Sequence, residues 1–408
     1  MTAAVLLIVG GLSIPVYAYV LYPLVLRLLA RTVPSPCAPT EWPAITIILP
    51  VHNEEAVIEG TLQAVLASDY PPERRRILVI SDASNDRTDE IVKSVADRGV
   101  ELARLPVRGG KTAAENAAAA IVETEIVVNT DASVRLHPGG LKALVTALWD
   151  PTVGVASGRD VSVGSKTASP NVAESGYVGY EMWVRDLETR AGGIVGASGC
   201  FFASRRGVQG EIVPAALSRD FAAPLIAREH GLRSVSVPGA ICFVPQASSI
   251  RREYRRKVRT MSRGLQTLFY KRRLLNPSRY GRFAWMLASH KLARWLVPWA
   301  ILVCGAGSLL LAWAVPTLRP PVGLVWGFVM TCSTISWLMP EARLPRIVAI
   351  PAYVTWGLVA GVHAWISSLR GDLTPTWEPT KRAALEGPIA ERGPSRTASL
   401  GGLRKAPE

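Results

Sequence analysis

The chain has 408 residues, of which 49% are hydrophobic and 19% are charged, and its formal net charge is +14. This composition is too apolar for one ordinary soluble domain and too charged for a pure bundle of membrane helices, so it indicates a soluble domain joined to membrane segments. The five cysteines show no paired spacing, which predicts neither a zinc site nor a disulfide framework and suits a reduced, cytoplasmic central region.

Residues 3–26 form an almost uninterrupted apolar stretch that is followed directly by Arg27 and Arg31. A stretch of this length spans a bilayer, so we expect a transmembrane helix with its amino terminus outside. A cleaved signal peptide is the alternative, but the segment lacks a basic start, its apolar core is too long, and no small-x-small cleavage site is obvious. We assign residues 1–30 to this helix and the proline-rich residues 31–43 to a linker.

From residue 44 the pattern alternates between strand and helix, and it predicts a parallel, doubly wound α/β sheet. The expected strands are residues 45–50, 76–82, 100–105 and 126–130, and the expected helices are residues 54–67, 85–97 and 111–123. Polar residues follow three of these strands, in the run from Pro50 to Glu54, at Asp82 and at Asp131. Because open α/β sheets bind ligands at the carboxyl ends of their strands, these three ends are expected to line one site.

After Asp131 the alternation weakens. We expect helices at residues 141–148, 177–189 and 220–230, a strand at residues 153–163, and a glycine-rich passage at residues 192–199. The catalytic domain is predicted to occupy residues 44–248.

A basic segment follows this domain. Residues 251–273 hold ten Lys or Arg against one Glu, with apolar residues interleaved, which is typical of an amphipathic helix on an anionic membrane surface. Nucleic-acid binding is the other interpretation of such a charge run, but the sequence then enters a membrane, so no nucleic-acid partner is predicted. We assign residues 249–291 to interfacial helices, the second of them at residues 283–293.

The C-terminal part contains three further apolar stretches. Residues 292–315, 322–338 and 347–367 are each near the length of a membrane span, giving four spans in all and a C-terminal membrane region at residues 292–369. Three spans after a cytoplasmic domain would place the tail outside, whereas Arg370, Lys381 and Arg382 favour the cytoplasm, and a re-entrant helix among the three would remove the conflict. Residues 370–408 form the tail, predicted to be partly disordered.

The strand-end residues carry a specific chemistry. Asp82, Asp86 and Asp131, together with Lys111 after two glycines, predict a nucleotide diphosphate held partly through Mg²⁺ or Mn²⁺, because hard cations prefer carboxylate and phosphate oxygens. Lys111 can neutralise a phosphate from the amino end of its helix. Taken singly, each Asp is equally compatible with capping the next helix, and Lys111 with a solvated loop cation.

Six motifs in order resemble the membrane-bound family 2 glycosyltransferases, which have a GT-A nucleotide-sugar-binding domain with a Rossmann-like mixed sheet. The motifs are Pro50-Val-His-Asn-Glu-Glu55, Asp82-Ala-Ser-Asn-Asp86, Gly110-Lys111, Thr130-Asp131-Ala-Ser133, Gly196-Ala-Ser-Gly199 with Arg205-Arg206, and Asp220. The resemblance covers about residues 44–275 and, with the flanking membrane helices, most of the chain.

The resemblance implies roles for individual residues of the donor site. Pro50, His52 and Glu54 would border the nucleotide, and Asp82 would contact the uracil or ribose. Asp131 would be the metal-binding carboxylate of the D-x-D motif, with Ser133 in place of its second Asp, so the cation would be held largely by Asp131 or through water.

It also implies the catalytic and acceptor-side residues. Asp220 would be the catalytic base that takes the acceptor proton, preceded here by Arg219 rather than by an acidic residue, and a neighbouring cation would favour the ionised carboxylate. Arg256 and Arg259 match the arginines that pair with the diphosphate, whereas Thr260 replaces the Trp that offers an acceptor sugar a stacking face.

The predicted function is therefore that of a metal-dependent, inverting glycosyltransferase at the cytoplasmic face of the cell membrane. Its donor would be a nucleotide sugar, expected to be UDP-linked, and its acceptor a lipid-linked (polyprenyl-linked) or growing saccharide. A processive polysaccharide synthase and exporter, and a non-catalytic nucleotide-sugar-binding membrane partner, are the alternatives. Neither the sugar nor the acceptor follows from the sequence.

Overall fold

The computed structural model describes residues 1–34, 36–163, 172–245, 250–340, 342, 344–372 and 376. Its centre is an eight-stranded mixed sheet with the strand order β3-β2-β1-β4-β7-β6-β8-β5. The strands are β1 (Ile45–Val51), β2 (Arg75–Ser81), β3 (Val100–Arg104), β4 (Ile126–Thr130), β5 (Arg135–Leu136), β6 (Val153–Val163), β7 (Phe201–Arg205) and β8 (Arg233–Pro245).

The first half of the sheet is parallel, as the βα alternation predicted. Strands β3, β2, β1 and β4 run in one direction, and every residue of β1 and β4 is buried. Central strands of a parallel sheet are covered on both faces, which is why these strands are nearly continuous apolar runs. The wholly parallel arrangement stops there, because β7 pairs antiparallel with both β4 and β6. The result is the mixed sheet expected of a GT-A domain.

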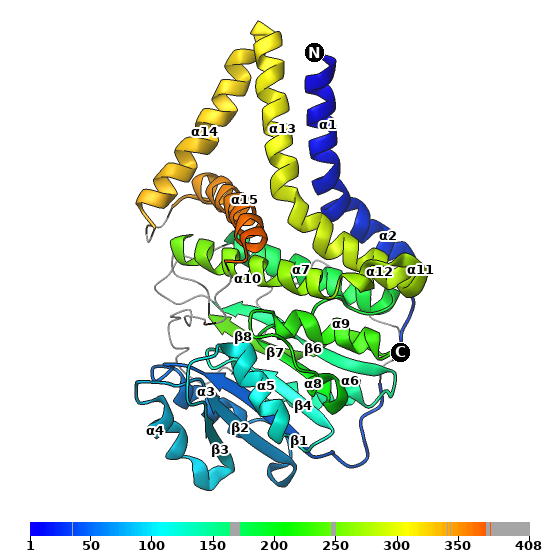
Figure 1. The fold of residues 1–408 in the computed structure, drawn as a ribbon, viewed down its shortest axis with the longest axis vertical. Coiled ribbons are helices and arrows are strands. Elements are labelled where there is room, and N and C mark those ends of the chain that lie inside the picture. Colours follow the sequence, from blue (N-terminus) through cyan, green and yellow to red (C-terminus); the bar gives the residue numbers. More distant parts are fainter. Residues whose placement is uncertain are drawn as a thin grey trace, which may run out of the picture.

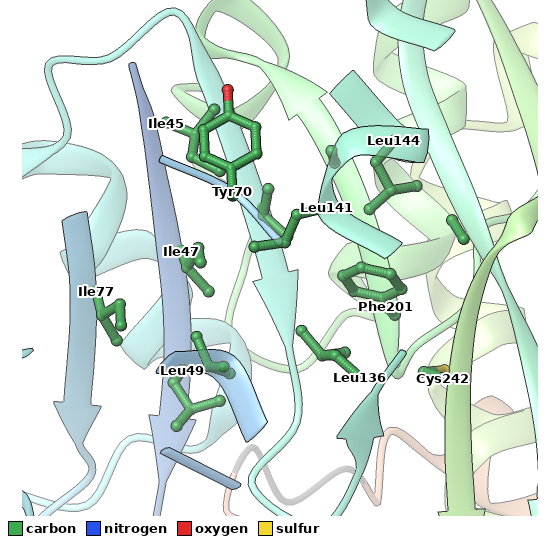
Figure 2. Close-up of a cluster of buried hydrophobic side chains, with 14 of the residues drawn as sticks. Ile45, Ile47, Leu49, Tyr70, Ile77, Leu136, Leu141, Leu144, Phe201 and Cys242 are labelled. Carbon is green, nitrogen blue, oxygen red and sulfur yellow. The ribbon is translucent and has the colours of Figure 1, made fainter. Parts of the chain in front are cut away.

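Helices cover both faces of this sheet. The helices of the catalytic domain are α3 (Ile58–Leu66), α4 (Thr88–Lys93), α5 (Lys111–Ile121), α6 (Gly140–Leu148), α7 (Val172–Ala191), α8 (Arg206–Gln209) and α9 (Arg219–Glu229). Ile45, Ile47 and Leu49 of β1 pack with Leu141 and Leu144 of α6 in the core on one face (Figure 2). On the other face the intervening residues of β1 and β2 pack against Ala114 and Ala118 of α5. Alternate residues of one strand therefore hold helices on opposite sides.

Four helices are long and apolar enough to cross a membrane. They are Thr2–Leu29 (α1, η1 and α2), Arg282–Ala314 (α12, η5 and α13), Pro316–Leu338 (which contains α14) and Arg346–Arg370 (α15). The separate interfacial helix expected at residues 283–293 is not formed, because these residues continue through η5 into α13 as one helix. The predicted disordered tail lies outside the described residues, apart from residues 370–372 and 376.

The remaining helices lie between the catalytic sheet and the long helices. The basic segment forms α10 (Ile250–Tyr270), followed by the short η4 (Arg272–Leu275) and α11 (Pro277–Tyr280). Figure 1 shows α7 and α10 running across the molecule above the sheet, with α1, α13 and α14 rising away from them. The strand ends that carry the predicted site therefore belong to a domain whose upper layer adjoins the four candidate membrane-spanning helices.

Candidate active site

Two loops at the carboxyl ends of β1 and β2 interlock. The imidazole Nδ1 of His52 lies 2.7 Å from the carbonyl oxygen of Asp82, and the backbone N–H of Glu54 donates to the Thr88 hydroxyl at 2.8 Å. Asn53 and Ala83 both have a backbone φ of about +52°, which is unusual for residues other than glycine. The two loops therefore hold one another in sharply turned conformations that bring the predicted nucleotide-binding residues together. Pro50 is buried at the end of β1 beside them.

Asp82 fixes the loop that precedes Lys111. Its carboxylate accepts hydrogen bonds from the backbone N–H groups of Gly109 at 2.7 Å and Gly110 at 2.8 Å, and the residue is 1% exposed. Gly110 has a φ of 88°, a left-handed conformation that glycine adopts without strain, and α5 begins at the next residue. Asp82 thus positions the start of α5, a structural role beside the donor contact that the family resemblance implies.

Lys111 connects residues that lie far apart in the sequence. Its ammonium Nζ lies 2.5 Å from Oδ1 of Asp131 at the end of β4, and it donates to the carbonyl oxygen of Gly199 at 2.9 Å. Burial alone would lower the pKa of Lys111, but the carboxylates of Asp131, Glu115 and Asp220 outweigh it and raise the pKa above its ordinary value. Lys111 is therefore a persistent cation at the centre of the site.

Asp220 lies on the other side of Gly199. A Cβ atom added to Gly199 would come within 2.8 Å of Oδ2 of Asp220, so the carboxylate packs directly against this glycine. The Ser218 hydroxyl donates to Oδ1 of Asp220, and the backbone N–H of Ala197 donates to the Asp220 carbonyl at 3.2 Å. Asp220 stands in the first turn of α9, so its backbone fits a helix start while its carboxylate faces the glycine-rich passage.

Arg219, although adjacent in sequence, is not the cation that interacts with the Asp220 carboxylate. The Arg219 side chain is buried and turned away, and its guanidinium donates to the carbonyl oxygens of Gln209 at 3.0 Å and Glu211 at 3.1 Å and to the Asn116 side chain. The expectation that Arg219 favours the ionised base was therefore wrong, since residues adjacent in a helix point in different directions. The cations that interact with the Asp220 carboxylate are Lys111 and Arg263. Burial lowers the pKa of Arg263, and the carboxylates of Asp220 and Glu115 partly offset that effect.

Arg263 of α10 is a site residue that sequence reasoning missed. Its Nη2 donates to the Thr112 hydroxyl at 2.8 Å and to the carbonyl oxygens of Ala215 at 3.0 Å and Leu217 at 2.5 Å. These bonds fasten α10 to the start of α5 and to the segment that leads into Asp220. The predicted Arg256 instead forms an ion pair with Glu253 at 2.8 Å, and Arg259 is half-buried one turn before Arg263.

Glu115 is a second residue that sequence reasoning missed. It lies one turn after Lys111 in α5, is 1% exposed, and has a carboxylate oxygen 4.0 Å from the Lys111 ammonium. Burial raises the pKa of Glu115 above its ordinary value. The positive charges of Lys111 and Arg219 lower that pKa, and the negative charges of Asp220 and Asp131 raise it further. Only its spacing from Lys111 could have indicated it, because an Ala-rich helix gives no sign of which face is buried.

The donor set for a divalent cation is small. Asp131 offers one carboxylate at the end of β4, and Ser133 is half-buried in the turn that follows. Within the described ranges no group of three or more His, Cys, Asp or Glu could hold a metal. This set still fits Mg²⁺ or Mn²⁺ bound to a nucleotide, because such ions are commonly held by one or two carboxylates and the substrate phosphates. Asp131 is the residue that would hold it.

A largely apolar cavity of about 560 Å³ lies away from these residues, between the linker residues Val33 and Cys37 and helix α6. It contains none of the predicted site residues, so the candidate active site remains the group around Lys111.

Comparison with known proteins gives an independent assignment. Residues 46–212 match the family model of glycosyl transferase family 2. A probable glycosyltransferase, YdaM, of Bacillus subtilis is 31% identical over 125 residues, which are 29% of this chain and 30% of the relative. A beta-monoglucosyldiacylglycerol synthase of Synechocystis is 29% identical over 122 residues, which are 29% of this chain and 26% of the relative. The match thus spans less than a third of these relatives.

A solved structure shares the fold over nearly its whole length. The mannosyltransferase PcManGT from Pyrobaculum calidifontis, in complex with GDP-Man and Mn²⁺, superimposes with a TM-score of 0.69 at 22% identity. The superposition covers 89% of this chain and 99% of that one. The sheet and its flanking helices therefore share the GT-A fold of that structure.

Proposed function

The chain belongs to glycosyltransferase family 2 through its GT-A domain, and from this premise we propose that it is an inverting glycosyltransferase at the cytoplasmic face of the membrane. Its donor would be a nucleotide sugar, with UDP as the nucleotide first to be tested. Its acceptor would be a lipid-linked or growing saccharide. The anchoring helices and the basic helix α10 support a reaction at a membrane surface.

The convergence of charged residues around Lys111 carries this proposal. Asp131 and Gly199 both contact the Lys111 ammonium, and Asp220 lies against Gly199, although these residues span more than a quarter of the chain. Such an arrangement of one cation between two carboxylates suits a reaction in which one carboxylate adjoins a leaving diphosphate and the other adjoins an incoming nucleophile.

In the proposed reaction Asp220 accepts the proton of the acceptor hydroxyl while that oxygen attacks the anomeric carbon. General-base assistance of this kind contributes about 10²- to 10⁴-fold in rate. The bond to the nucleotide diphosphate breaks on the opposite face, so the anomeric configuration inverts and the diphosphate leaves with the bonding electrons. Lys111 remains charged and neutralises part of the negative charge that develops on the diphosphate.

We infer that a divalent cation binds with the donor, because Asp131 fits that role and because the mannosyltransferase of the same fold holds Mn²⁺. When bound, the cation would neutralise the diphosphate. Asp131 would then exchange its contact with Lys111 for the cation, which frees the ammonium for a phosphate oxygen. Removal of the cation with EDTA is expected to stop transfer, and Mg²⁺ or Mn²⁺ to restore it.

The test is a screen of nucleotide sugars with the full chain in nanodiscs, read as nucleotide release and as product mass. We expect release with one donor class, and loss of at least ~10²-fold in Asp220→Asn. Asp186→Asn is the matched control, because Asp186 is an exposed partner of Arg190 on α7. Equal release by wild type and Asp220→Asn would remove Asp220 from the mechanism, and a polymer product would favour a processive synthase over single addition.

A further inference from the structure

A buried group of charged residues lies where α7 meets the membrane helices. We call it the junction cluster, and its members are Glu181, Arg185, Glu188, His290, Lys291 and Arg294. Glu181 accepts contacts from Arg294 at 2.6 Å, His290 at 3.0 Å and Arg185 at 3.3 Å. Figure 1 shows α7 close beneath the segment that begins with α12, between the sheet and the long helices. The cluster thus occupies the junction between catalytic domain and membrane.

The charges of the junction cluster do not balance. Glu188 accepts from the Tyr22 hydroxyl at 2.5 Å and pairs with His290 at 2.6 Å, so both carboxylates are engaged. With Lys291 protonated and His290 neutral, Arg185, Lys291 and Arg294 carry three positive charges against these two carboxylates. Because an uncompensated charge is costly in a buried environment, a bound anion would stabilise this charged form of the cluster.

Several buried donors of the cluster have no acceptor. Nη1 of Arg185 and both Nε and Nη2 of Arg294 lack a partner, and these residues are 8% and 7% exposed. One acceptor, Oε2 of Glu188, also lacks a donor, so unmatched donors outnumber it three to one. An unsatisfied buried donor costs about 1–3 kcal/mol, more when charged. The excess donors are what a bound anion would satisfy.

Lys291 is the accessible member of this group. It is half-buried, and among the described residues its ammonium makes no hydrogen bond or ion pair. Its Nζ lies 5.4 Å from the centre of the Phe221 ring, and a Cβ added to Gly196 would come within 3.1 Å of it. Lys291 therefore reaches from a membrane helix to the residue next to Asp220.

The cluster also contacts the backbone that positions the proposed base. Arg185 donates to the carbonyl oxygen of Ala197 at 3.4 Å, and the N–H of Ala197 donates to the carbonyl of Asp220 at 3.2 Å. The excess positive charge therefore adjoins the acceptor side of the site, where that side meets the membrane.

We propose that the junction cluster, through Lys291, binds the phosphate group that links the saccharide of the acceptor to its lipid, while a hydroxyl of that saccharide faces Asp220. This inference rests on the proposed function and names its acceptor class as a phosphate-bearing lipid rather than a neutral one such as a diacylglycerol. A phosphate supplies the missing negative charge and several acceptor oxygens, and charge-assisted bonds of this kind are the strong ones. The adjacent membrane helices would receive its hydrocarbon chain.

The experiment measures lipid binding to the full chain in detergent by native mass spectrometry, with no donor present. Undecaprenyl phosphate is expected to bind at least ~10-fold more tightly than undecaprenol or dioleoylglycerol. Lys291→Met is expected to reduce that ratio to ~3-fold or less without changing undecaprenol binding, and Lys291→Arg to retain it. Lys271→Met is the control, because Lys271 pairs with Glu229 at 2.6 Å outside the cluster.

The outcomes separate the alternatives. Equal binding of undecaprenyl phosphate and undecaprenol by the wild type would overturn the proposal without recourse to any variant, as would equal weakening of both lipids by Lys291→Met. Displacement of the lipid by inorganic phosphate would assign the site to free phosphate instead. Because no donor is used, a failure of this test leaves the proposed glycosyl transfer standing, and absence of transfer with intact lipid binding would count only against that function.

Discussion

At the scale of single residues, several oxygen atoms share the ammonium group of Lys111. Lys111 contacts Asp131 and Gly199 and lies near Glu115, so it occupies the position where a donor diphosphate is expected. A diphosphate carries more negative charge than a single carboxylate and therefore competes effectively for Lys111. Under the proposed function, the contact between Lys111 and Asp131 would keep both charges paired while no donor is bound.

Glu115 gives a prediction about stability and pH. Because its pKa is raised in the folded chain, its contribution to stability is fully present below its ordinary value of about 4.5 and is lost as pH rises through the folded value. Glu115→Gln removes this loss and keeps the shape of the side chain. We therefore expect the variant to be more stable than the wild type at pH 8, by about 1 kcal/mol, and to show a smaller advantage at pH 4.5.

The measurement is the apparent thermal midpoint of the purified protein at both pH values. Glu123→Gln is the control, because Glu123 is exposed at the end of the segment that contains α5. A destabilised Glu115→Gln at pH 8 would show that the carboxylate stabilises the ammonium of Lys111 more than burial penalises it.

Gly199 gives a prediction about the proposed base. The Cβ of Gly199→Ala would lie 2.8 Å from Oδ2 and 3.5 Å from Cγ of Asp220, which is too close for both groups to keep their places. The carboxylate must shift, and a displacement of about 1 Å can cost ~10²-fold in rate. We expect kcat to fall by ~10- to 100-fold while KM for the donor changes little, since the Gly199 carbonyl still meets Lys111.

Steady-state kinetics would test this, with Gly207→Ala as the matched control. Gly207 has no atom within 4 Å of an added Cβ, so its variant should retain wild-type kcat. An unchanged kcat in Gly199→Ala would mean that Asp220 acts from a position other than the one seen here.

At the scale of helices and strands, α10 holds the segment that leads into Asp220. Arg263 joins it to Thr112 and to the carbonyls of Ala215 and Leu217, just ahead of Ser218 and Asp220. Arg263→Gln cannot make all of these bonds at once, so the segment before Asp220 should loosen. We expect kcat to fall by about tenfold with a smaller change in donor KM, as for a residue that positions the base.

Kinetics on the purified variant, together with its apparent thermal midpoint, would check this. Arg263→Lys should recover part of the loss, whereas a variant that merely unfolds would also lose its cooperative thermal transition. If donor KM rises while kcat stays constant, Arg263 contacts the nucleotide rather than the loop.

The elements that the sequence predicted correctly are those with local signals. Strands β1, β2, β3 and β4 were found because a parallel strand buried on both faces is a continuous apolar run. Strand β7 was missed because Cys200 and the glycine-rich passage come directly before it, and β8 because Pro238 and Gly239 interrupt its apolar run. The partners of both strands also lie far away in the sequence. The antiparallel pairing of β7 with β4 is a tertiary outcome that no periodicity encodes.

The site residues that the sequence indicated are likewise those with a local signal. Asp82, Lys111 and Asp131 follow strands or a glycine turn. The structure places Asp131 at the Lys111 ammonium and Asp220 against Gly199, whereas Asp82 holds the loop that precedes Lys111. Glu115 and Arg263 were missed, since their importance comes from the direction of a side chain within a helix rather than from a motif. The same limitation explains the error over Arg219, whose neighbour in sequence is not its neighbour in space. The roles given to the site residues all stay predictions: donor binding by Pro50, His52, Glu54, Asp82, Lys111, Arg256 and Arg259, metal binding by Asp131 and Ser133, and catalysis by Asp220.

At the scale of the whole molecule, the N-terminal helix and α13 form one closely packed pair. A Cβ added to Gly11 would meet the carbonyl of Ala300 at 2.5 Å, and one added to Gly307 would meet the carbonyl of Ala4 at 2.9 Å. Small residues at such crossings let two membrane helices approach closely. His290, Lys291 and Arg294 of the junction cluster lie directly before α13 or at its first residue in the same long helix, so this pair of apolar helices is joined to the cluster.

Helix α15 is arranged differently from α1, α13 and α14. It packs along the basic helix α10, where Lys257 lies 3.6 Å from the centre of the Tyr353 ring and the Gln266 side chain donates to the Ser368 carbonyl at 2.7 Å. Tyr254 of α10 also pairs with His363 of α15 at 2.9 Å. A helix that follows an interfacial helix over this length shares its orientation, and Figure 1 shows α15 at the base of α13 rather than beside it. By length and composition, α15 is one of the four candidate spans.

This arrangement predicts the membrane topology. If α13 and α14 form a hairpin and α15 lies on the cytoplasmic surface, the turn at Thr317 is outside and Asp372 is inside, which places Arg370 where basic residues are preferred. A membrane-impermeant maleimide applied to intact cells should label Thr317→Cys and leave Asp372→Cys at the background level of the wild type, whose own cysteines set the baseline. Both positions are exposed, so permeabilisation should make both reactive. Labelling of Asp372→Cys in intact cells would instead show that α15 crosses the bilayer, and its contacts with α10 would then have to form at only one of its ends.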